Sequence, residues 1–81
     1  MTAREARAAA KALGYIEIKE KSHGQPVFKR GKGVSGCPKF ITPDVDQHNG
    51  GVWKGADSVK ALASKATRSG TFDAALNRIG P

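Results

Sequence analysis

The sequence predicts a single domain of the α+β class, with an N-terminal helix, a small antiparallel sheet and one or two further short helices. Three observations support this. The first residues are rich in alanine, the middle of the chain holds short alternating stretches separated by turns, and residues 57–66 repeat apolar side chains at helical spacing. With 81 residues, the chain (1–81) is expected to form one domain with a small apolar core.

Residues 3–13 are predicted to form the N-terminal helix. Alanine has the highest intrinsic helix propensity, and Gly14 is a residue of the type that commonly ends a helix. The apolar face of this segment is mostly alanine. We therefore expect the helix to pack closely against another element while burying little apolar surface.

Residues 15–23 alternate between apolar and polar side chains, as a strand with one buried face does. Ile16 and Ile18 are expected on one face. The side chains expected on the other face are Glu17, Lys19, Lys21 and His23. The predicted segments that follow are a turn at 24–26, a strand at 27–30, a basic loop at 31–36 and a strand at 39–42. Short strands separated by turns favour an antiparallel sheet.

Two helices are predicted in the last third of the chain. The first spans residues 57–66, with Asp57 as its N-cap. Its apolar face consists of Val59, Leu62, Ala63 and Ala66. The second is short, begins at Thr71 and ends at Gly80. The side chains expected to form its apolar face are Phe72, Leu76 and Ile79.

The segment 40–54 is chemically the richest part of the chain. It begins as a short apolar strand, which Pro43 interrupts because proline has no backbone N–H to donate. The groups that follow and are able to bind or move protons are Asp44, Asp46, Gln47, His48 and Asn49. Because binding and catalytic residues concentrate on loops held by a rigid scaffold, we predict a functional loop here.

The net charge of +7, from 14 basic and 7 acidic residues, predicts a polyanion or an acidic protein surface as a partner. The charge is uneven, because residues 19–39 hold six basic residues against one acidic residue. Lys19, Lys29 and Arg30 are therefore predicted to contact substrate phosphates. A solvated basic face is the alternative reading of the same residues.

Composition excludes several classes of site and location. The single cysteine, Cys37, excludes an internal disulfide, and two histidines with one cysteine are too few for an ordinary Cys/His zinc site. No apolar run approaches the length of a membrane span, and Met1–Glu5 lacks the apolar stretch of a signal peptide. A start directly in a helix also fits a piece cut from a longer chain.

His23 and His48 are the only side chains that titrate near neutral pH without help. Cleavage of RNA without a metal needs a base for the 2′-OH proton, an acid for the leaving oxygen and cations for the developing charge. The residues predicted to be catalytic are His23, His48, Lys21, Asp46, Lys54 and Thr71. Those predicted to bind substrate are Lys19, Lys29, Arg30, Trp53 and Arg68.

Each of these assignments has a structural alternative. The two histidines are equally explained as a surface side chain and a loop hydrogen-bonder, and Trp53 as a core residue rather than a surface for base stacking. Thr71 is also a plausible helix cap. Asp44, Asp46 and His48 at alternate positions suit a hard cation, but carboxylates that bond nearby backbone donors are favoured, and Asp46 is expected to orient His48. No metal and no cofactor is predicted.

Several segments resemble the C-terminal toxin domains of bacterial polymorphic toxins, which end CdiA-type contact-dependent growth inhibition proteins. The segments that carry the resemblance are Ser22–Lys29, Ile41–Asp46, His48–Lys54, Ala56–Lys60 and Arg68–Asp73. The likeness extends from about Gly14 to Gly80. It implies an antibacterial ribonuclease acting on tRNA, neutralised by a cognate immunity protein with an acidic surface. It also implies a domain at the C-terminus of a much larger secreted or surface-exposed protein, acting in the cytoplasm of the target cell.

The resemblance further implies the small fold of barnase, EndoU, colicin and RelE nucleases, in which an N-terminal helix packs on a small twisted antiparallel sheet. That fold expects further strands in residues 57–79, where the sequence pattern predicts helix. Two other functions fit the residues. One is a non-catalytic basic module that binds nucleic acid, and the other is a metal-dependent DNase built on Asp44, Asp46 and His48.

Overall fold

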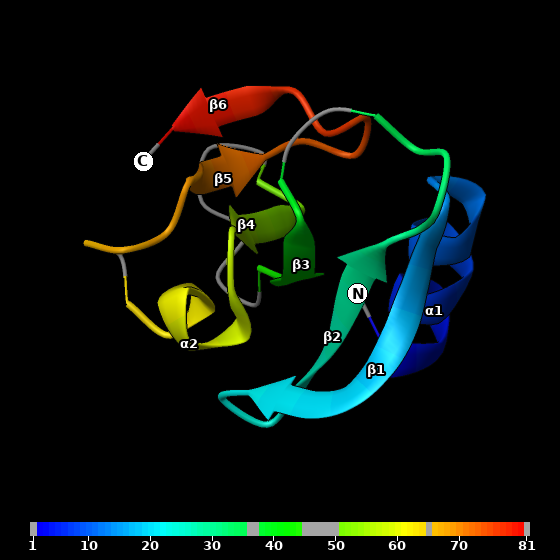
Figure 1. The fold of residues 1–81 in the computed structure, drawn as a ribbon, viewed down its shortest axis with the longest axis horizontal. Coiled ribbons are helices and arrows are strands. Elements are labelled where there is room, and N and C mark those ends of the chain that lie inside the picture. Colours follow the sequence, from blue (N-terminus) through cyan, green and yellow to red (C-terminus); the bar gives the residue numbers. More distant parts are fainter. Residues whose placement is uncertain (1, 36–37, 45–50, 65, 81) are drawn as a thin grey trace.

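The computed structural model describes residues 2–35, 38–44, 51–64 and 66–80, and it confirms the α+β class. Its elements, in chain order, are α1 (Ala3–Ala12), β1 (Tyr15–Ser22), β2 (Gln25–Arg30), β3 (Phe40–Pro43), β4 (Trp53–Ala56), α2 (Val59–Leu62), β5 (Gly70–Phe72) and β6 (Arg78–Gly80) (Figure 1). None of the described helices is long and apolar enough to span a membrane.

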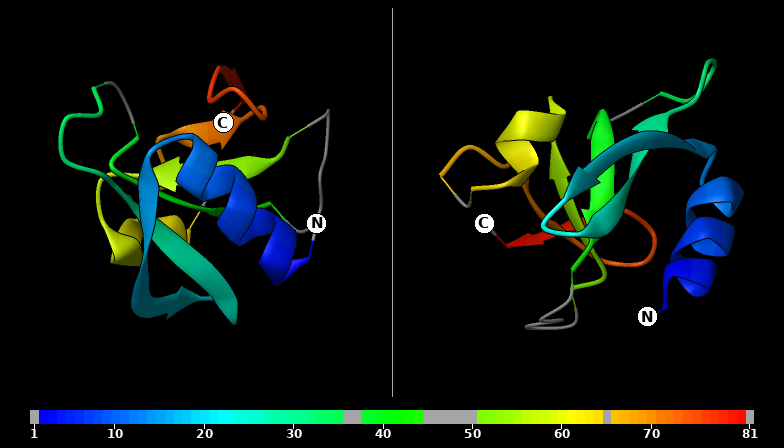
Figure 2. Two further views of the ribbon diagram at one scale, coloured as in Figure 1. Left: turned by 90° about the vertical axis from the view of Figure 1, so that its right-hand side faces the viewer. Right: turned by 90° about the horizontal axis from the view of Figure 1, so that it is seen from below.

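The six strands form one antiparallel sheet in the order β1-β2-β3-β4-β5-β6, so each strand pairs with the next one along the chain. This meander leaves β1 and β6 at the two edges. The sheet is visibly twisted, with α1 and α2 on opposite sides of it (Figure 2). The predicted twisted antiparallel sheet with an N-terminal helix packed on it is therefore confirmed.

The N-terminal helix begins with a reciprocal capping box. The hydroxyl of Thr2 accepts a hydrogen bond from the Glu5 backbone N–H at 3.1 Å, and the Thr2 N–H donates to the Glu5 carboxylate at 2.9 Å. Ala6 and Ala10 are fully buried against the sheet, because their small side chains allow the helix to approach closely. The predicted Ala-rich helix is confirmed at this position.

The sheet separates two apolar clusters. The cluster on the α1 side consists of Ala6, Ala10, Tyr15, Phe28, Ile41, Trp53 and Phe72. The smaller cluster on the α2 side consists of Val27, Ala56 and Leu62. Successive residues of a strand alternate between these two faces, so Trp53 points toward α1 and Ala56 toward α2.

The predicted second helix is much shorter than expected. α2 covers only Val59–Leu62, and its N-cap is Ser58, not Asp57. The Ser58 hydroxyl accepts a hydrogen bond from the Ala61 backbone N–H at 3.1 Å, whereas Asp57 is exposed one position earlier. The Thr67 hydroxyl donates to the Ala61 carbonyl at 2.9 Å, which turns the chain away from the helix axis.

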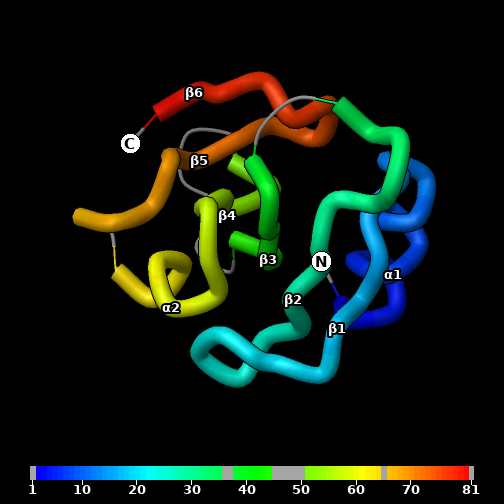
Figure 3. The backbone as a smooth tube through the Cα atoms, in the orientation of Figure 1, coloured from blue at the N-terminus to red at the C-terminus, as the bar shows by residue number. Residues whose placement is uncertain are grey.

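The predicted last helix over residues 71–79 is wrong, because the chain forms β5 and β6 there. The Asp73 carboxylate accepts hydrogen bonds from the backbone N–H groups of Ala75 and Asn77, both at 2.9 Å, and closes a turn between the two strands (Figure 3). Leu76 adopts a left-handed φ of 64° within that turn, which no helix permits. Thr71 therefore lies in a strand and does not cap a helix.

β4 was also not predicted, since its residues follow the two glycines of the predicted loop. It pairs with β3 and β5 through its backbone, a long-range contact that leaves no local periodicity in a four-residue strand. The further strands that the family resemblance implied are thus present as β5 and β6, in place of the last predicted helix, while the first is shortened to α2.

Candidate functional site

Three polar side chains form a row across the middle of the sheet. Thr42 of β3 pairs with Lys54 of β4, which pairs with Thr71 of β5. Directly opposed residues of antiparallel strands share a face, with their Cβ atoms roughly 4.5–5.5 Å apart. Lys54 precedes Ala56 by two positions in the same strand, so the row lies on the α2 face. The structure therefore brings the predicted residues Lys54 and Thr71 together.

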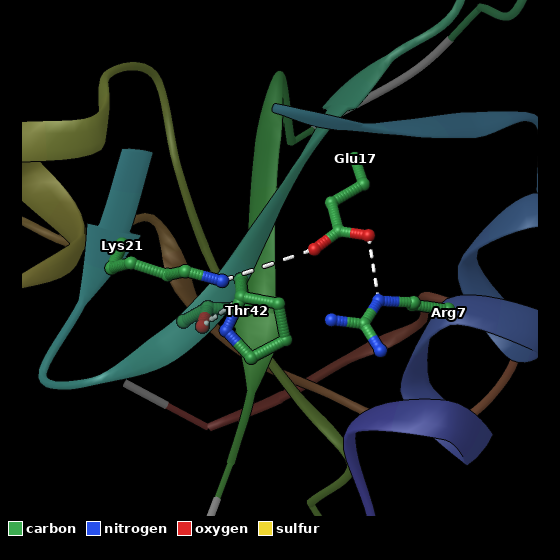
Figure 4. Close-up of polar contacts among 5 residues, drawn as sticks. Arg7, Glu17, Lys21 and Thr42 are labelled. Atoms are coloured by element: carbon green, nitrogen blue, oxygen red, sulfur yellow. Dashed lines mark hydrogen bonds and ion pairs between the residues drawn. The ribbon is translucent and has the colours of Figure 1, made fainter. Parts of the chain in front are cut away.

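Thr42 was missed by the sequence analysis. It is 3% exposed, and its hydroxyl donates to the Pro26 carbonyl at 2.8 Å (Figure 4). This bond ties Thr42 to β2, while strand pairing sets it beside Lys54. The sequence signal that could have identified Thr42 is its position immediately before the strand-breaking Pro43. A buried, hydrogen-bonded neighbour limits how far the base of the Lys54 side chain can move.

The same row lies at the base of the β3–β4 connection. The Asp44 backbone N–H donates to the Val52 carbonyl at 2.9 Å, and Asp44 is only 6% exposed. Val52 precedes Lys54 by two positions, so both described ends of this connection adjoin the row. The predicted residues Asp46 and His48 lie outside the described residues, as does Cys37.

His23 occupies the turn between β1 and β2. Its backbone has a left-handed φ of 49°, and its Nε2 lies 3.0 Å from the carbonyl oxygen of Ala63, directly after α2. Because a carbonyl can only accept, the ring nitrogen at this contact is the donor. His23 thus joins the sheet to the end of α2, while its side chain is solvent-exposed.

Lys21 belongs to a charged network with the N-terminal helix. The Glu17 carboxylate lies 2.7 Å from Arg7 Nε and 3.9 Å from Lys21 Nζ (Figure 4). About half of each cationic side chain is exposed, so these ion pairs contribute little to stability. Lys21 is directed toward this network, whereas Lys54 lies on the face covered by α2.

Arg68 lies in the connection between α2 and β5. The backbone N–H of the next residue, Ser69, donates to the Gly55 carbonyl at 2.8 Å, which places this connection beside the strand that carries Lys54. The Nε of Arg68 is buried and has no hydrogen-bond partner among the described residues. A buried guanidinium N–H without an acceptor carries an energetic cost.

Trp53 is fully buried and packs edge-on against Phe28, with ring centroids 5.9 Å apart and planes at 85°. The prediction that it stacks on a substrate base is wrong, because no face of the indole reaches the surface. The alternative reading, that Trp53 is a core residue, is the correct one. It anchors the first residue of β4, and Lys54 is the next residue.

The other predicted substrate-binding residues lie toward the β1 edge of the sheet. Lys19 and Lys29 are exposed, and Arg30 is partly buried. The Arg30 backbone N–H donates to the Lys39 carbonyl at 2.7 Å, and Lys39 Nζ lies 5.8 Å from the centre of the Phe40 ring. Through this pairing Lys29, Arg30 and Lys39 lie at the same end of the β2–β3 ladder, and this group is here called the basic cluster; Lys29 and Arg30 project to opposite faces of the strand.

Side chains that commonly bind metal ions do not cluster in the part of the chain that the structure describes. No group of three or more His, Cys, Asp or Glu side chains there is arranged to hold an ion. Asp44 is the one described member of the alternating Asp/Asp/His motif, so the motif as a whole lies outside this result.

Comparison with known proteins places these features in a family. The model of a family described as novel toxin 21 matches residues 8–81. A curated protein of Enterobacter cloacae, named 16S rRNA endonuclease CdiA, is 40% identical over 82 aligned residues, which cover 94% of this chain but 2% of that protein. The solved CdiA-CT/CdiI toxin and immunity complex from Enterobacter cloacae matches with a TM-score of 0.62 and 39% identity, over 100% of both chains. The predicted resemblance to CdiA-type toxin domains is confirmed.

Proposed function

We propose, from the premise that this chain belongs to the novel toxin 21 family, that it is a ribonuclease domain that cleaves 16S ribosomal RNA. The support for this substrate is the name of the 40% identical relative, a 16S rRNA endonuclease. The substrate implied by the sequence resemblance was tRNA. We therefore propose ribosomal RNA as the substrate, and the experiment below distinguishes it from tRNA.

The observation that carries this proposal is the row of Thr42, Lys54 and Thr71 at the base of the β3–β4 connection. It sets an ammonium group between two hydroxyl-bearing side chains near Asp44 and Val52, the described ends of a connection whose sequence includes Asp46 and His48. A cation beside a proton-transferring imidazole is what in-line attack of a 2′-hydroxyl on phosphorus requires. Arg68, in the connection that lies beside the strand of Lys54, is the second candidate cation for a phosphate.

In the proposed reaction, His48 removes the proton from a ribose 2′-hydroxyl while the oxygen attacks the adjacent phosphorus. The bond from phosphorus to the 5′-oxygen breaks, and that oxygen receives a proton from an acid, for which His23 is the candidate. The products are a 2′,3′-cyclic phosphate and a 5′-hydroxyl. Lys54 and Arg68 stabilise the charge on the phosphoryl oxygens, and Asp46 orients His48.

Lys21 and Thr71 keep smaller parts in this scheme. Lys21 is paired with Glu17 and precedes His23 by two positions, so we assign it a supporting electrostatic part beside that histidine. Thr71 is the strand neighbour of Lys54 and shapes the space in which the ammonium group lies.

The test is to incubate the purified domain with intact ribosomes, total tRNA and plasmid DNA, with and without EDTA, and to map the cleaved ends. We expect one cut in 16S rRNA that EDTA does not abolish, ending in a cyclic phosphate. His48→Ala and His23→Ala should each lower the cleavage rate by at least about 100-fold. Undiminished cleavage in both variants would refute the histidine assignment.

The same gel separates the alternatives. Cuts confined to tRNA would overturn the ribosomal substrate but keep the ribonuclease. Plasmid nicking that EDTA prevents would indicate the metal-dependent DNase. Intact nucleic acid bound with a steep salt dependence would indicate the non-catalytic module.

We propose in addition that a cognate immunity protein neutralises the domain, and that its contact surface is acidic. The support is the solved toxin and immunity complex that this chain matches, together with the net charge of +7. A ribosomal substrate places the action of the domain in the cytoplasm of the target cell, after delivery as part of a larger exoprotein. Rescue of toxin-producing cells by co-expression of the immunity protein tests the partnership.

A further inference from the structure

The solvent side of α1 carries a row of positive charge. Arg4, Arg7 and Lys11 follow one another at spacings of three and four residues, which place them on one face of a helix. All three are solvent-exposed. The face turned toward the sheet holds Ala6 and Ala10, which are fully buried. The three cations, here called the α1 stripe, therefore lie on the side of the helix that faces away from the core.

The described structure neutralises little of this charge. Among the described residues Arg4 and Lys11 form no ion pair, and only Arg7 contacts a carboxylate, that of Glu17 at 2.7 Å (Figure 4). The acidic residue of the helix itself, Glu5, is engaged in the capping box. Arg4 also lies in the first turn, where the helix dipole disfavours a cation, so helix stability does not account for it. Positive charge on α1 is thus available to a partner.

The α1 stripe fits a phosphate backbone better than a protein. The exposed residues beside the cations are Ala8 and Ala12, so the stripe offers no large apolar side chain for the centre of a protein interface. Small neighbours also let a chain of phosphates approach closely, and guanidinium groups bind phosphate oxygens in pairs. A membrane surface is disfavoured, because the apolar face of α1 is already buried in the domain.

We propose that the α1 stripe is a second RNA-binding surface, which holds phosphates of the substrate on the side of the sheet away from the reaction. The row of Thr42, Lys54 and Thr71, here called the Lys54 row, lies on the α2 face, and α1 lies on the opposite side of the sheet (Figure 2). The inference rests on the proposed function, which supplies RNA as the ligand. It extends that function, since neither the Lys54 row nor the basic cluster includes a residue of α1.

A binding surface on each side of the sheet favours folded RNA over a short single strand. The domain measures 26 × 23 × 23 Å along its principal axes, so a folded ribosomal RNA is large enough to contact both sides at once. A short strand at the Lys54 row would reach the α1 stripe only by passing around an edge of the sheet. The α1 stripe therefore contributes to affinity for the structured substrate and not to the chemical step.

The test compares two double variants that lose the same charge. Arg4→Gln with Lys11→Gln, the stripe variant, removes two cations of the α1 stripe and keeps the contact between Arg7 and Glu17. Lys32→Gln with Lys60→Gln is the control, because both lysines are exposed and neither belongs to the α1 stripe, the Lys54 row or the basic cluster. The probe is a folded fragment of 16S ribosomal RNA made with methylated 2′-hydroxyls, which the proposed mechanism cannot cleave. Circular dichroism should show both variants folded.

We expect the stripe variant to lower the slope of the logarithm of affinity against the logarithm of salt concentration by about 1.4–1.8, or roughly 0.7–0.9 for each lost phosphate contact. The control should leave this slope unchanged. With intact ribosomes, the stripe variant should need more substrate for half-maximal cleavage, while its maximal rate stays within about twofold of the wild-type rate.

Equal falls in slope for the two variants would overturn the inference, because net charge alone would then explain binding. An unchanged slope in the stripe variant would also overturn it, and weaker binding of the immunity protein by that variant would assign the α1 stripe to the protein partner instead. The slope is a binding measurement, so it decides the inference even if the wild-type domain cuts no RNA. That last outcome refutes only the proposed reaction.

Discussion

Lys54 is the residue at which the fold and the proposed chemistry meet most directly. Its backbone lies between β3 and β5, its neighbours across the sheet are Thr42 and Thr71, and its side chain is only partly exposed. A cation whose backbone is held between two strands stabilises developing phosphoryl charge with little reorganisation during the reaction.

We predict that Lys54→Ala lowers the RNA cleavage rate by about 100- to 1,000-fold, because the cation for the developing charge is removed. The measurement is a single-turnover cleavage assay, with thermal unfolding to show that the variant is folded. Lys60→Ala is the control, since Lys60 is a solvent-exposed lysine on α2. Equal losses in both variants would contradict a specific role for Lys54.

Asp73 shows how one carboxylate decides local structure. Hydrogen bonds from the backbone N–H of Asn77, from its side-chain amide and from the Ala75 N–H all favour the ionised form and lower the pKa of Asp73 below its ordinary value. A group whose pKa is lowered by folding stabilises the protein above its unfolded pKa, and this contribution is lost as the pH falls through the folded pKa.

We therefore predict that the wild-type domain is more stable than Asp73→Asn at neutral pH, and that the difference shrinks below about pH 4. Urea unfolding of both proteins from pH 7 to pH 3 measures it. The pKa of Glu5 is also lowered, by the hydrogen bond from the Thr2 backbone, but Glu5 is present in both proteins and cancels in the difference. A difference that stays constant with pH would show that the charge of Asp73 is unimportant.

Among the elements, β4 depends on a close approach at Gly55. A methyl group at this position would overlap the ring of Pro38 and lie 2.6 Å from the Phe72 ring. Pro38 is itself held in place, because its carbonyl accepts a hydrogen bond from the buried Tyr15 hydroxyl. The absence of a side chain at Gly55 is therefore required for β4 to pack beside the β2–β3 connection.

We predict that Gly55→Ala destabilises the domain by about 1–3 kcal/mol, which corresponds to a fall in Tm of roughly 5–20 °C. Gly80→Ala is the matched control, because a methyl group on Gly80 meets open space. Differential scanning calorimetry compares the two. A Gly55→Ala protein as stable as Gly80→Ala would mean that the packing around β4 relaxes freely.

For the molecule as a whole, the excess of positive charge controls how RNA binds. The net charge of +7 attracts phosphates at long range, and the cluster of Lys29, Arg30 and Lys39 concentrates part of it at the end of β2. Each phosphate contact releases counterions, so affinity falls linearly with salt on logarithmic axes.

We predict that the double variant Lys29→Ala, Lys39→Ala lowers the slope of this salt dependence by about 1.4, or roughly 0.7 for each lost contact with single-stranded RNA. An RNA with methylated 2′-hydroxyls serves as the probe, because the proposed mechanism cannot cleave it. Lys60→Ala provides the control for a lysine outside the cluster. An unchanged slope in the double variant would show that this cluster faces solvent in the complex.

The sequence alone determined the features that depend on local patterns and composition. The alanine content predicted α1, the alternation of Ile16 and Ile18 with charged residues predicted β1, and the charge predicted an anionic or acidic partner. Five segments, including the two around Pro43 and Gly51, carried the resemblance to CdiA-type toxin domains, and the family match and the 40% identical relative confirm it.

Only the tertiary structure decided the features that depend on contacts between distant residues. Phe72, Leu76 and Ile79 have helical spacing, yet strand pairing and the Asp73 turn override it, because β structure is stabilised by partners outside the local sequence. The burial of Trp53 and the meeting of Lys54 with Thr71 follow from the same pairing. A sequence pattern records which residue types are present, whereas the order and register of the strands decide which of them face one another.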